Sequence, residues 1–321
     1  MSNLNLVNSL GRRVERPPLL RDQLWSLESN LLEGAWRALG RGGPDEASDR
    51  GERLGRRFGP HSRKHQHVLF NLRMGFPHWS RQQVEATAPR IWGSLGRTLM
   101  EYSVLAQIAD PRQDRIQVVD LGGQAHMRAS GRPAIFVAPH LANWNLLPVA
   151  AARAGIPLAV VYRRQSNPAI ERLMSNWRAA LGCDFLEVGE ALRGIQRELR
   201  AGRSVGLLMD QRYDRGAEVP FFGVPAATTL VPARLALRLG VPLIPARIER
   251  RGGARFVITV YRPLEIDPGE GEASAALALT LRINKLFASW IEAAPDQWLC
   301  VKRRWDRPYV TLPGGWRVRS A

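Results

Sequence analysis

The stretch that decides the fold reads RPAIFVAPHLANWN and spans residues 132–145. Its apolar run at 134–138 is short and contains β-branched and aromatic residues, which predicts a buried strand, and His140 follows that strand closely. We expect a helix to begin near Asn143. Ligands bind beyond the carboxyl ends of the strands in open α/β sheets, so His140 lies at the predicted binding edge. Because histidine titrates near physiological pH, an imidazole at this place is suited to act as a general base.

Short β-rich runs alternate with helical segments around this stretch. The predicted strands are residues 134–138, 158–162, 205–209, 242–248 and 256–261. The predicted helices between them are residues 143–153, 168–181, 189–201 and 231–239. This alternation predicts an α/β fold with a mixed, mostly parallel sheet flanked by helices.

Residues 1–110 are predicted to be mainly helical and to form an N-terminal extension. From Leu20 onward, apolar residues recur at helical spacing between charged ones. These apolar residues are Leu24, Leu27, Leu31, Ala35 and Leu39. The resulting amphipathic helix either packs on its own domain or associates with a membrane, where Trp25 and Trp36 would suit the interface.

The rest of the extension is predicted to contain a loop and two helices. Residues 40–59 are rich in Gly, Asp and Arg and are predicted to form the loop. Residues 64–74 and 80–108 are predicted to be helical, with Ser80 as the N-cap of the second helix. We therefore predict a helical region over residues 1–110 and an α/β core over residues 111–321, in one integrated domain.

The charge of the chain predicts an anionic partner. The formal net charge is +17 at pH 7, although 45% hydrophobic and 23% charged residues are ordinary for a globular protein. A basic surface favours lipid headgroups, nucleic acid or an acidic carrier protein. No zinc-finger spacing, RNP-like motif or basic zipper supports nucleic acid. Cys183 and Cys300 form no metal or disulfide pattern, and neither a signal peptide nor a membrane-spanning helix is expected.

Two further groups of residues have alternative interpretations. Tryptophans and cationic residues mix near the C-terminus, as they do at membrane interfaces, although core packing explains some of the tryptophans equally well. These tryptophans are Trp290, Trp298, Trp305 and Trp316. His61, His65 and His67 lie close together without acidic or cysteine partners, so we interpret them as surface residues and predict no metal site.

Several segments, in order along the chain, resemble the bacterial lipid A biosynthesis (lauroyl/myristoyl) acyltransferases, a family of the lysophospholipid acyltransferase-like superfamily. The strand followed by His140, Asn143 and Trp144 is similar to the family's His-x4-acid signature. The other matching segments are residues 71–77, 161–168, 207–211, 219–229, 240–245, 295–298 and 303–305. Their shared order makes the resemblance much stronger than a single motif would.

The resemblance implies a glycerolipid acyltransferase-like fold and a specific reaction. The reaction would move a fatty acyl chain from acyl carrier protein, or acyl-CoA, to a hydroxyl of a lipid A precursor or related glycolipid. His140 would act as the general base, without a metal or redox cofactor. The protein would lie peripherally on the cytoplasmic face of the inner membrane, against an anionic lipid surface, and would not bind nucleic acid.

The sequence departs from the family at Asn145, where an acidic residue is usual. An amide can still orient the imidazole, but it has no negative charge to stabilise an imidazolium. Asn145 is therefore either a weakened orienting residue or a helix-start residue, and the chain is either an acyltransferase or a catalytically impaired lipid-binding or regulatory paralogue. Asp210, at the end of another predicted strand, is our candidate for a compensating carboxylate; alternatively, it bonds backbone groups of its own loop.

Five other residues are predicted to bind substrate. Arg163 and Arg164 follow a predicted strand and either grip phosphate through forked hydrogen bonds or form solvated or structural ion pairs. Gln211 belongs to the Asp-Gln pair that the resemblance places at the site. Thr228 and Thr229 either cap the following helix or donate to a phosphate at its N-terminus.

Overall fold

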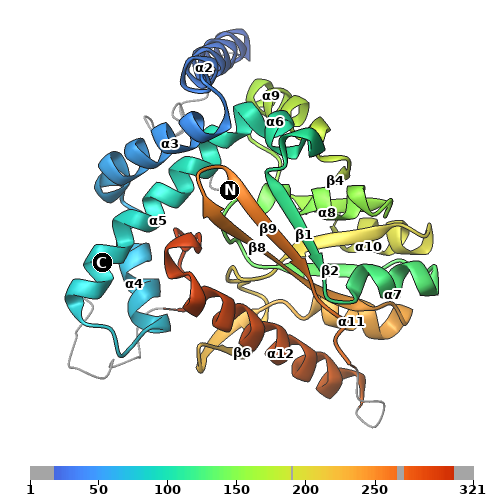
Figure 1. Cartoon of the computed structure of the whole chain (residues 1–321). Coiled ribbons are helices and arrows are strands. Elements are labelled where there is room, and N and C mark those ends of the chain that lie inside the picture. Colours follow the sequence, from blue (N-terminus) through green and yellow to red (C-terminus); the bar gives the residue numbers. More distant parts are fainter. Residues whose placement is uncertain (1–17, 189–190, 266–270, 307–321) are drawn as a thin grey trace.

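The computed structural model describes residues 18–188, 191–265 and 271–306. A seven-stranded sheet with the order β1-β9-β8-β2-β5-β3-β4 crosses the molecule (Figure 1). Its strands are β1 (Ile116–Asp120), β2 (Ile135–Ala138), β3 (Leu158–Tyr162), β4 (Asp184–Glu187), β5 (Ser204–Leu208), β8 (Leu243–Gly252) and β9 (Arg255–Val260). Neighbouring strands are parallel except for the antiparallel pair β8–β9. The predicted mixed, mostly parallel sheet is confirmed.

Helices cover this sheet and extend it. The helices that follow β1 in the chain are α7 (Gly123–Ser130), α8 (Pro148–Arg153), α9 (Pro168–Arg178), α10 (Ala191–Arg200), α11 (Val231–Leu239) and α12 (Glu272–Ala293). Helix α8 packs on β3, α10 on β4 and β5, and α11 on β2 and β8. A separate hairpin of β6 (Ala217–Phe221) and β7 (Val224–Thr228) packs on α12. The predicted helix near Asn143 begins later, because a 3₁₀ turn at Trp144–Leu146 precedes α8.

The part of the N-terminal region that the structure describes is helical. Its elements are α2 (Pro18–Leu39), α3 (Pro44–Phe58), α4 (His65–Gly75), α5 (Arg81–Glu101) and α6 (Leu105–Ala109). Ser80 caps α5 as predicted: its hydroxyl accepts from the Gln83 backbone N–H, and the Gln83 side chain accepts from the Ser80 N–H. Residues 1–17 of the predicted extension lie outside the described residues.

The loop predicted over residues 40–59 is wrong, because most of it forms helix α3. Pro44 occupies the first turn, where its missing N–H costs nothing. Gly51 and Gly55 lie directly against the backbone of α5, where a β-carbon would collide with Gly96 or Trp92. The glycines therefore serve close helix packing, which a reading of local sequence takes for a loop signal.

One continuous hydrophobic core joins the helical region to the sheet. It contains Val68 and Ile91 from the N-terminal helices, Ile135 and Ile258 from the sheet, and Trp298 near the C-terminus. Burial also decides the role of most of the tryptophans considered for a membrane interface. Those in the core are Trp36, Trp290, Trp298 and Trp305, each no more than 5% exposed, while Trp316 lies outside the described residues.

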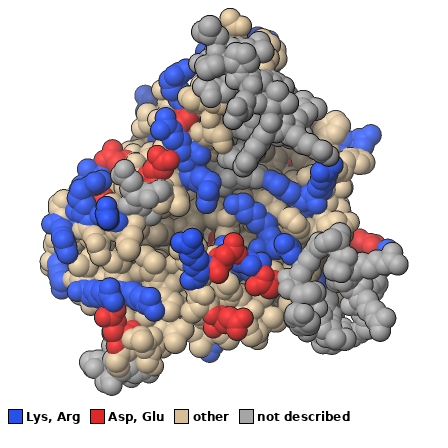
Figure 2. Space-filling model, turned by 180° about the vertical axis from the view of Figure 1, so that it is seen from behind, with Lys and Arg blue, Asp and Glu red and all other residues tan. Residues whose placement is uncertain are grey.

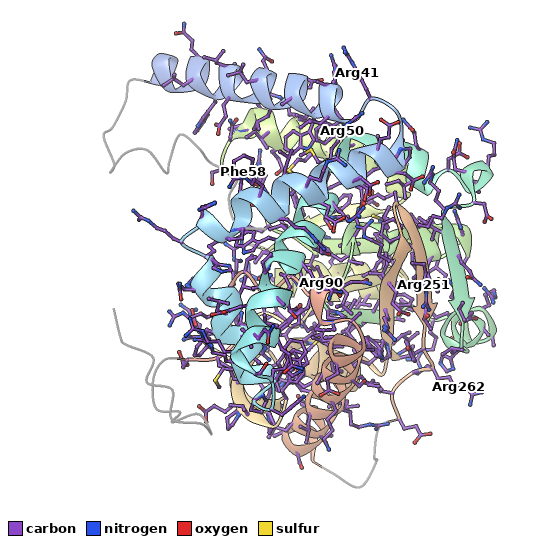
Figure 3. The ribbon with its side chains drawn as sticks, turned by 60° about the vertical axis from the view of Figure 1, so that its left-hand side comes forward. Arg41, Arg50, Phe58, Arg90, Arg251 and Arg262 are labelled. Carbon is purple, nitrogen blue, oxygen red and sulfur yellow. The ribbon has the colours of Figure 1, made fainter. Side chains whose placement is uncertain are left out.

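Basic side chains are spread over the surface. On the face shown in Figure 2, lysine and arginine side chains gather around a hollow. Exposed arginines also occur on many different elements (Figure 3): Arg41 follows α2, Arg90 lies on α5, Arg251 on β8, and Arg262 follows β9. The sign and spread of this charge favour an extended anionic partner. Within the described ranges, no helix is both long enough and apolar enough to span a bilayer.

Candidate active site

His140 and Asp210 meet at the carboxyl ends of two neighbouring parallel strands. His140 follows β2 and Asp210 follows β5, and these strands pair through Ile135–Val205 to Ala138–Leu208. The His140 Nδ1 atom lies 2.6 Å from Asp210 Oδ1. A carboxylate can only accept here, so Nδ1 carries the proton and Nε2 is left to accept one. The pair thus has the arrangement of a general base and the residue that orients it.

Asp210 is held in its charged form inside the protein. Burial alone would raise the pKa of its carboxyl, but the charge and hydrogen bond of His140 and the indole N–H of Trp298 oppose this effect. The net pKa is lower than the ordinary aspartate value. Trp298 Nε1 donates to Asp210 Oδ2 over 2.9 Å, so both carboxylate oxygens have partners. A fixed carboxylate fixes the tautomer and orientation of the imidazole.

The C-terminal segment closes over the loop that carries His140. Leu299 N donates to the His140 carbonyl and Ala142 N donates to the Gln297 carbonyl, each over 2.9 Å. Ala142 has a φ of 44°, which is uncommon for a residue with a side chain. Thr98 on α5 donates to the Ala142 carbonyl over 3.0 Å, so this backbone conformation is held from both sides.

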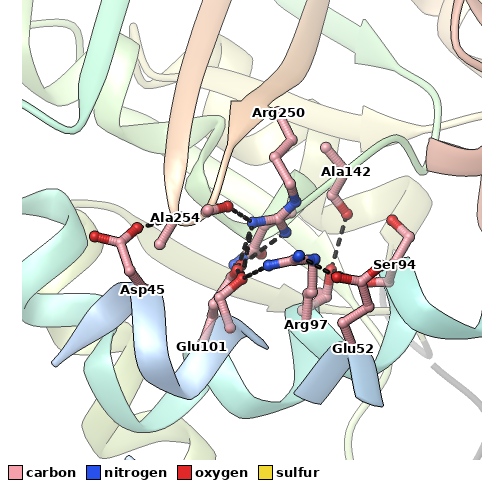
Figure 4. Close-up of polar contacts among 12 residues, drawn as sticks. Asp45, Glu52, Ser94, Arg97, Glu101, Ala142, Arg250 and Ala254 are labelled. Carbon is pink, nitrogen blue, oxygen red and sulfur yellow. Dashed lines mark hydrogen bonds and ion pairs between the residues drawn. The ribbon is translucent and has the colours of Figure 1, made fainter. Parts of the chain in front are cut away.

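A buried polar network lies beneath the same loop (Figure 4). Glu101 on α5 is fully buried and accepts from Arg250 on β8 and from Ser48 on α3. Its second oxygen accepts from Asn143 Nδ2 over 2.9 Å. Arg97 on α5 is paired with Asp49 at 2.7 Å. Helix α5 therefore holds the loop after His140 through the bonds of Thr98 to Ala142 and of Glu101 to Asn143.

Asn145 does not contact His140 in this structure. Its side-chain oxygen accepts from the Tyr102 hydroxyl over 2.7 Å, and its amide donates to Asn143 Oδ1 over 3.0 Å. Asn145 is thus a member of the buried network and lines the cavity described below. The carboxylate that contacts the imidazole comes from Asp210, the residue we named as a compensating acid.

Gln211 lies at the Nε2 side of the imidazole and links it to Lys302. Gln211 Nε2 lies 3.3 Å from His140 Nε2, and Gln211 Oε1 accepts from Lys302 Nζ over 3.2 Å. Burial lowers the pKa of Lys302, and the nearby charges of Arg163 and Lys64 lower it further. Positive groups that repel one another at a cavity rim favour an anionic ligand that relieves the repulsion.

A cavity of about 270 Å³ opens beside this group and extends along the sheet. His140, Gln211, Arg163 and Lys302 lie in its wall. The remaining wall is mainly apolar and includes Leu147, Leu158, Val160, Leu181, Phe185 and Leu208. A pocket that is mainly apolar and has a few polar groups beside His140 suits a ligand with a reactive head and an aliphatic tail.

The other predicted binding residues lie outside this wall. Arg164 is exposed. Thr228 is fully buried, donates to the Ala226 carbonyl and accepts from Arg304, while Thr229 accepts from the Val231 N–H at the start of α11. Both threonine hydroxyls thus bond within the protein in this structure, and Thr229 lies one position before Leu230, the N-cap of α11. Two neighbouring threonines before a helix look alike in sequence, and only packing separates them.

The sequence reasoning missed the roles of Trp298, Lys302 and Asn71. Asn71 Nδ2 donates to the carbonyls of Cys300 and Lys302, over 2.7 and 2.6 Å, and its oxygen accepts from the Arg304 N–H. Asn71 therefore fixes the backbone that carries Lys302. All of these residues stood in or beside matching segments, but a segment match does not reveal which side chains touch.

Within the described part of the chain, no three His, Cys, Asp or Glu side chains gather as metal ligands. His65 and His67 are partly buried rather than surface residues. His65 Nδ1 lies 3.1 Å from the Trp92 indole nitrogen, and His67 Nδ1 lies 3.3 Å from the Val301 carbonyl oxygen.

The candidate site is a histidine–carboxylate pair beside an apolar cavity, at the edge of an α/β sheet. Comparison with known proteins identifies the class as acyltransferases. A model of the bacterial lipid A biosynthesis acyltransferases matches residues 24–307. The chain belongs to this family, and the resemblance found in the sequence is confirmed.

Two similar proteins are named as acyltransferases. The phosphatidylinositol mannoside acyltransferase of Mycobacterium tuberculosis (strain ATCC 25618 / H37Rv) is 27% identical over 195 residues, or 58% of this chain and 59% of that protein. The chain thus spans about three fifths of the length of this relative. The lipid A biosynthesis acyltransferase of Haemophilus influenzae is 24% identical over 241 residues, 72% of each chain. A solved acyltransferase, PlsC from Thermotoga maritima, aligns over 70% of this chain with 15% identity and a TM-score of 0.37.

Proposed function

We propose that this protein transfers a fatty acyl chain from a thioester, on acyl carrier protein or coenzyme A, to a hydroxyl of a lipid A precursor or related glycolipid. The observation that carries the proposal is the His140–Asp210 pair at the polar end of an apolar cavity. Family membership over residues 24–307 supports the same reaction class.

In the proposed reaction, His140 Nε2 takes the proton of the acceptor hydroxyl as its oxygen attacks the thioester carbonyl. The carbonyl oxygen becomes negative in the tetrahedral intermediate. When the intermediate collapses, the carbon–sulfur bond breaks, the ester forms, and the imidazolium returns the proton to the leaving thiolate. Asp210 keeps Nδ1 protonated and stabilises the transient positive charge on the ring.

The cations at the rim would bind the charged part of a substrate. Arg163 and Lys302 lie in the cavity wall, and Lys302 reaches Gln211, which contacts His140. Phosphate groups occur both in lipid A precursors and in the phosphopantetheine arm of the donors, and an arginine can hold phosphate through two parallel hydrogen bonds. We propose that these two residues bind such a phosphate, with Arg164 available nearby in sequence.

A turnover assay tests the proposal directly. Purified protein is mixed with acyl carrier protein or coenzyme A thioesters and a lipid A precursor, and products are detected by mass spectrometry. We expect a product heavier by one acyl group, together with release of free thiol. If neither donor supports transfer to a lipid A precursor or related glycolipid, the proposal is wrong.

The second candidate function is a lipid-binding or regulatory protein, which the amide at Asn145 favours. Asn145→Asp separates the two. We expect the acyl transfer rate to change by less than about threefold and the protein to be destabilised by about 1–2 kcal/mol, because a carboxylate cannot donate to Asn143 Oδ1. Rates are measured beside thermal unfolding. A large gain in rate would instead identify position 145 as the missing acid of an impaired enzyme.

We further propose that the protein lies on the cytoplasmic face of the inner membrane and contacts it through α2. Leu27 and Leu31, one turn apart, are 56% and 66% exposed. An adjoining side of α2 faces the protein: Glu28 and Ser29 are buried, and Asn167, in the loop after β3, donates to Glu28 over 2.9 Å. An amphipathic helix with its leucines outward on a basic protein suits an anionic lipid surface.

Replacing both Leu27 and Leu31 by glutamate tests this contact. We expect binding to vesicles that contain phosphatidylglycerol to weaken by at least about tenfold, since two large apolar side chains lose a buried position and gain charge. Leu277→Glu is the matched control, because Leu277 is 42% exposed on a different helix, α12. Vesicle sedimentation measures binding. Equal binding of the double variant and the wild type would exclude α2 as the contact.

A further inference from the structure

Three adjacent strands form one wall of the cavity, and we call a row of residues paired across these strands a level. In β2, β5 and β3, Phe136 pairs with Gly206 and Gly206 pairs with Val160. Side chains at paired positions of parallel strands point to the same face of the sheet. Phe136 and Val160 both line the cavity, and Gly206 lies between them in the same wall. The middle position of this level thus has no side chain.

The backbone at Gly206 does not itself require glycine. The φ of Gly206 is not positive, so a residue with a side chain can adopt the same backbone conformation. A β-carbon placed there would lie 3.5 Å from Val160 Cγ2 and 3.8 Å from Leu158 Cδ1, which is ordinary van der Waals contact. Glycine in a strand interior is unfavourable, and it often marks a place where another molecule approaches the backbone. The absence of a side chain at Gly206 therefore leaves open space in the cavity in front of the strand.

Gly206 lies where a long acyl chain that starts at His140 would pass. Its partner Phe136 lies two residues before the carboxyl end of β2 and four residues before His140, a span of at most about 13 Å for a fully extended chain. Leu158 also lines the cavity and pairs with Ser204, two residues before Gly206, so the cavity continues one level further from His140. A straight chain with its reactive end at His140 would pass over Gly206 to reach Leu158.

We propose that Gly206 determines how long an acyl chain the cavity accepts. The effect of Gly206 on acyl transfer rests on the proposed function. The effect of Gly206 on the length of the chain that the cavity binds does not require that transfer takes place. A side chain at position 206 would fill the passage between Phe136 and Val160 and exclude the distal part of long chains. Shorter chains, which end before this level, would bind as before.

Gly206→Ala and Gly206→Leu test the proposal in the full-length protein. Two profiles are measured with decanoyl, lauroyl, myristoyl and palmitoyl chains: equilibrium binding of the free fatty acids, and kcat/KM with the corresponding thioesters. We expect the palmitoyl-to-decanoyl ratio to fall about tenfold in Gly206→Ala and about a hundredfold in Gly206→Leu, because one methylene group in a closed pocket changes selection by one to two orders of magnitude.

Val205→Ile is the matched control, because it adds one methyl group to the same strand on the opposite face of the sheet. We expect it to leave the length profile unchanged. Gly206→Ala should unfold at a temperature equal to or above that of the wild type, since alanine restricts the unfolded chain and the site has room for it. A loss of long-chain selection therefore cannot be attributed to weakened folding.

The two proposals fail in different ways. Suppose that both proteins transfer acyl chains and that their palmitoyl-to-decanoyl ratios of kcat/KM are equal. This result would overturn the role of Gly206 and leave the proposed acyltransferase function intact. Binding that shifts toward shorter fatty acids in Gly206→Ala, without turnover by any form, would support Gly206 and reject the reaction. Unchanged binding profiles in both Gly206 variants, with or without turnover, would overturn the inference.

Discussion

Replacement of His140 by alanine is expected to lower kcat for acyl transfer by about 10⁴-fold. Among the described residues of the cavity wall, His140 is the only histidine, so in the variant none of them offers an imidazole to take the proton of the acceptor hydroxyl. Its KM should change little, because the apolar wall and the cationic rim remain. Initial rates at saturating donor and acceptor, with product detection by mass spectrometry, measure the effect.

His126→Ala is the matched control for this substitution. His126 is an exposed histidine on α7 and is absent from the cavity wall, so the rate should stay within about twofold of the wild type. Equal turnover by His140→Ala and the wild type would show that another group acts as the base.

Asp210→Asn is expected to lower kcat by about 10³–10⁴-fold while leaving the fold in place. The indole N–H of Trp298 must still donate to an oxygen, so the amide oxygen takes that side and the amide NH₂ faces His140 Nδ1. Nδ1 must then accept, which moves the ring proton to Nε2. An imidazole protonated at Nε2 cannot take a proton from the acceptor hydroxyl.

The same variant should change the acid sensitivity of the fold. Because the pKa of Asp210 is lowered in the folded protein, the ionised carboxylate stabilises the fold above the ordinary aspartate pKa. That stabilisation is lost as the pH falls through the lowered folded pKa. Asp210→Asn lacks this dependence, so its free energy of unfolding should fall less steeply in acid, as denaturant titrations between neutral and acidic pH measure.

Asp214→Asn is the control for both effects. Asp214 follows the same strand, but its side chain is 80% exposed and pairs with Arg212. Its replacement should leave the rate and the acid dependence near those of the wild type. Full activity of Asp210→Asn would mean that the imidazole is oriented by some other group and that the buried pair serves folding alone.

The sequence alone predicted the α/β class, the strand before His140 and the strand before Asp210. Strands and helices leave a local signature, because side chains alternate every two residues in one and every three to four in the other. The edge of a parallel sheet collects residues that follow its strands, so both site residues could be named. The sequence missed β1 and β4, at the two ends of the sheet order.

Only the tertiary structure decided which residues touch. Asp210 is 70 residues from His140 in the chain and Trp298 is 88 residues from Asp210, and nothing local to either position specifies those pairings. In the sequence the glycines of α3 are a loop signal, and only the packing of α5 against them shows their role. The exposure of Leu27 and Leu31 was likewise decided by packing, which buries Glu28 and Ser29 on the adjoining side of α2. Periodicity fixes which residues share a face of an element, but the packing of distant elements determines what that face meets.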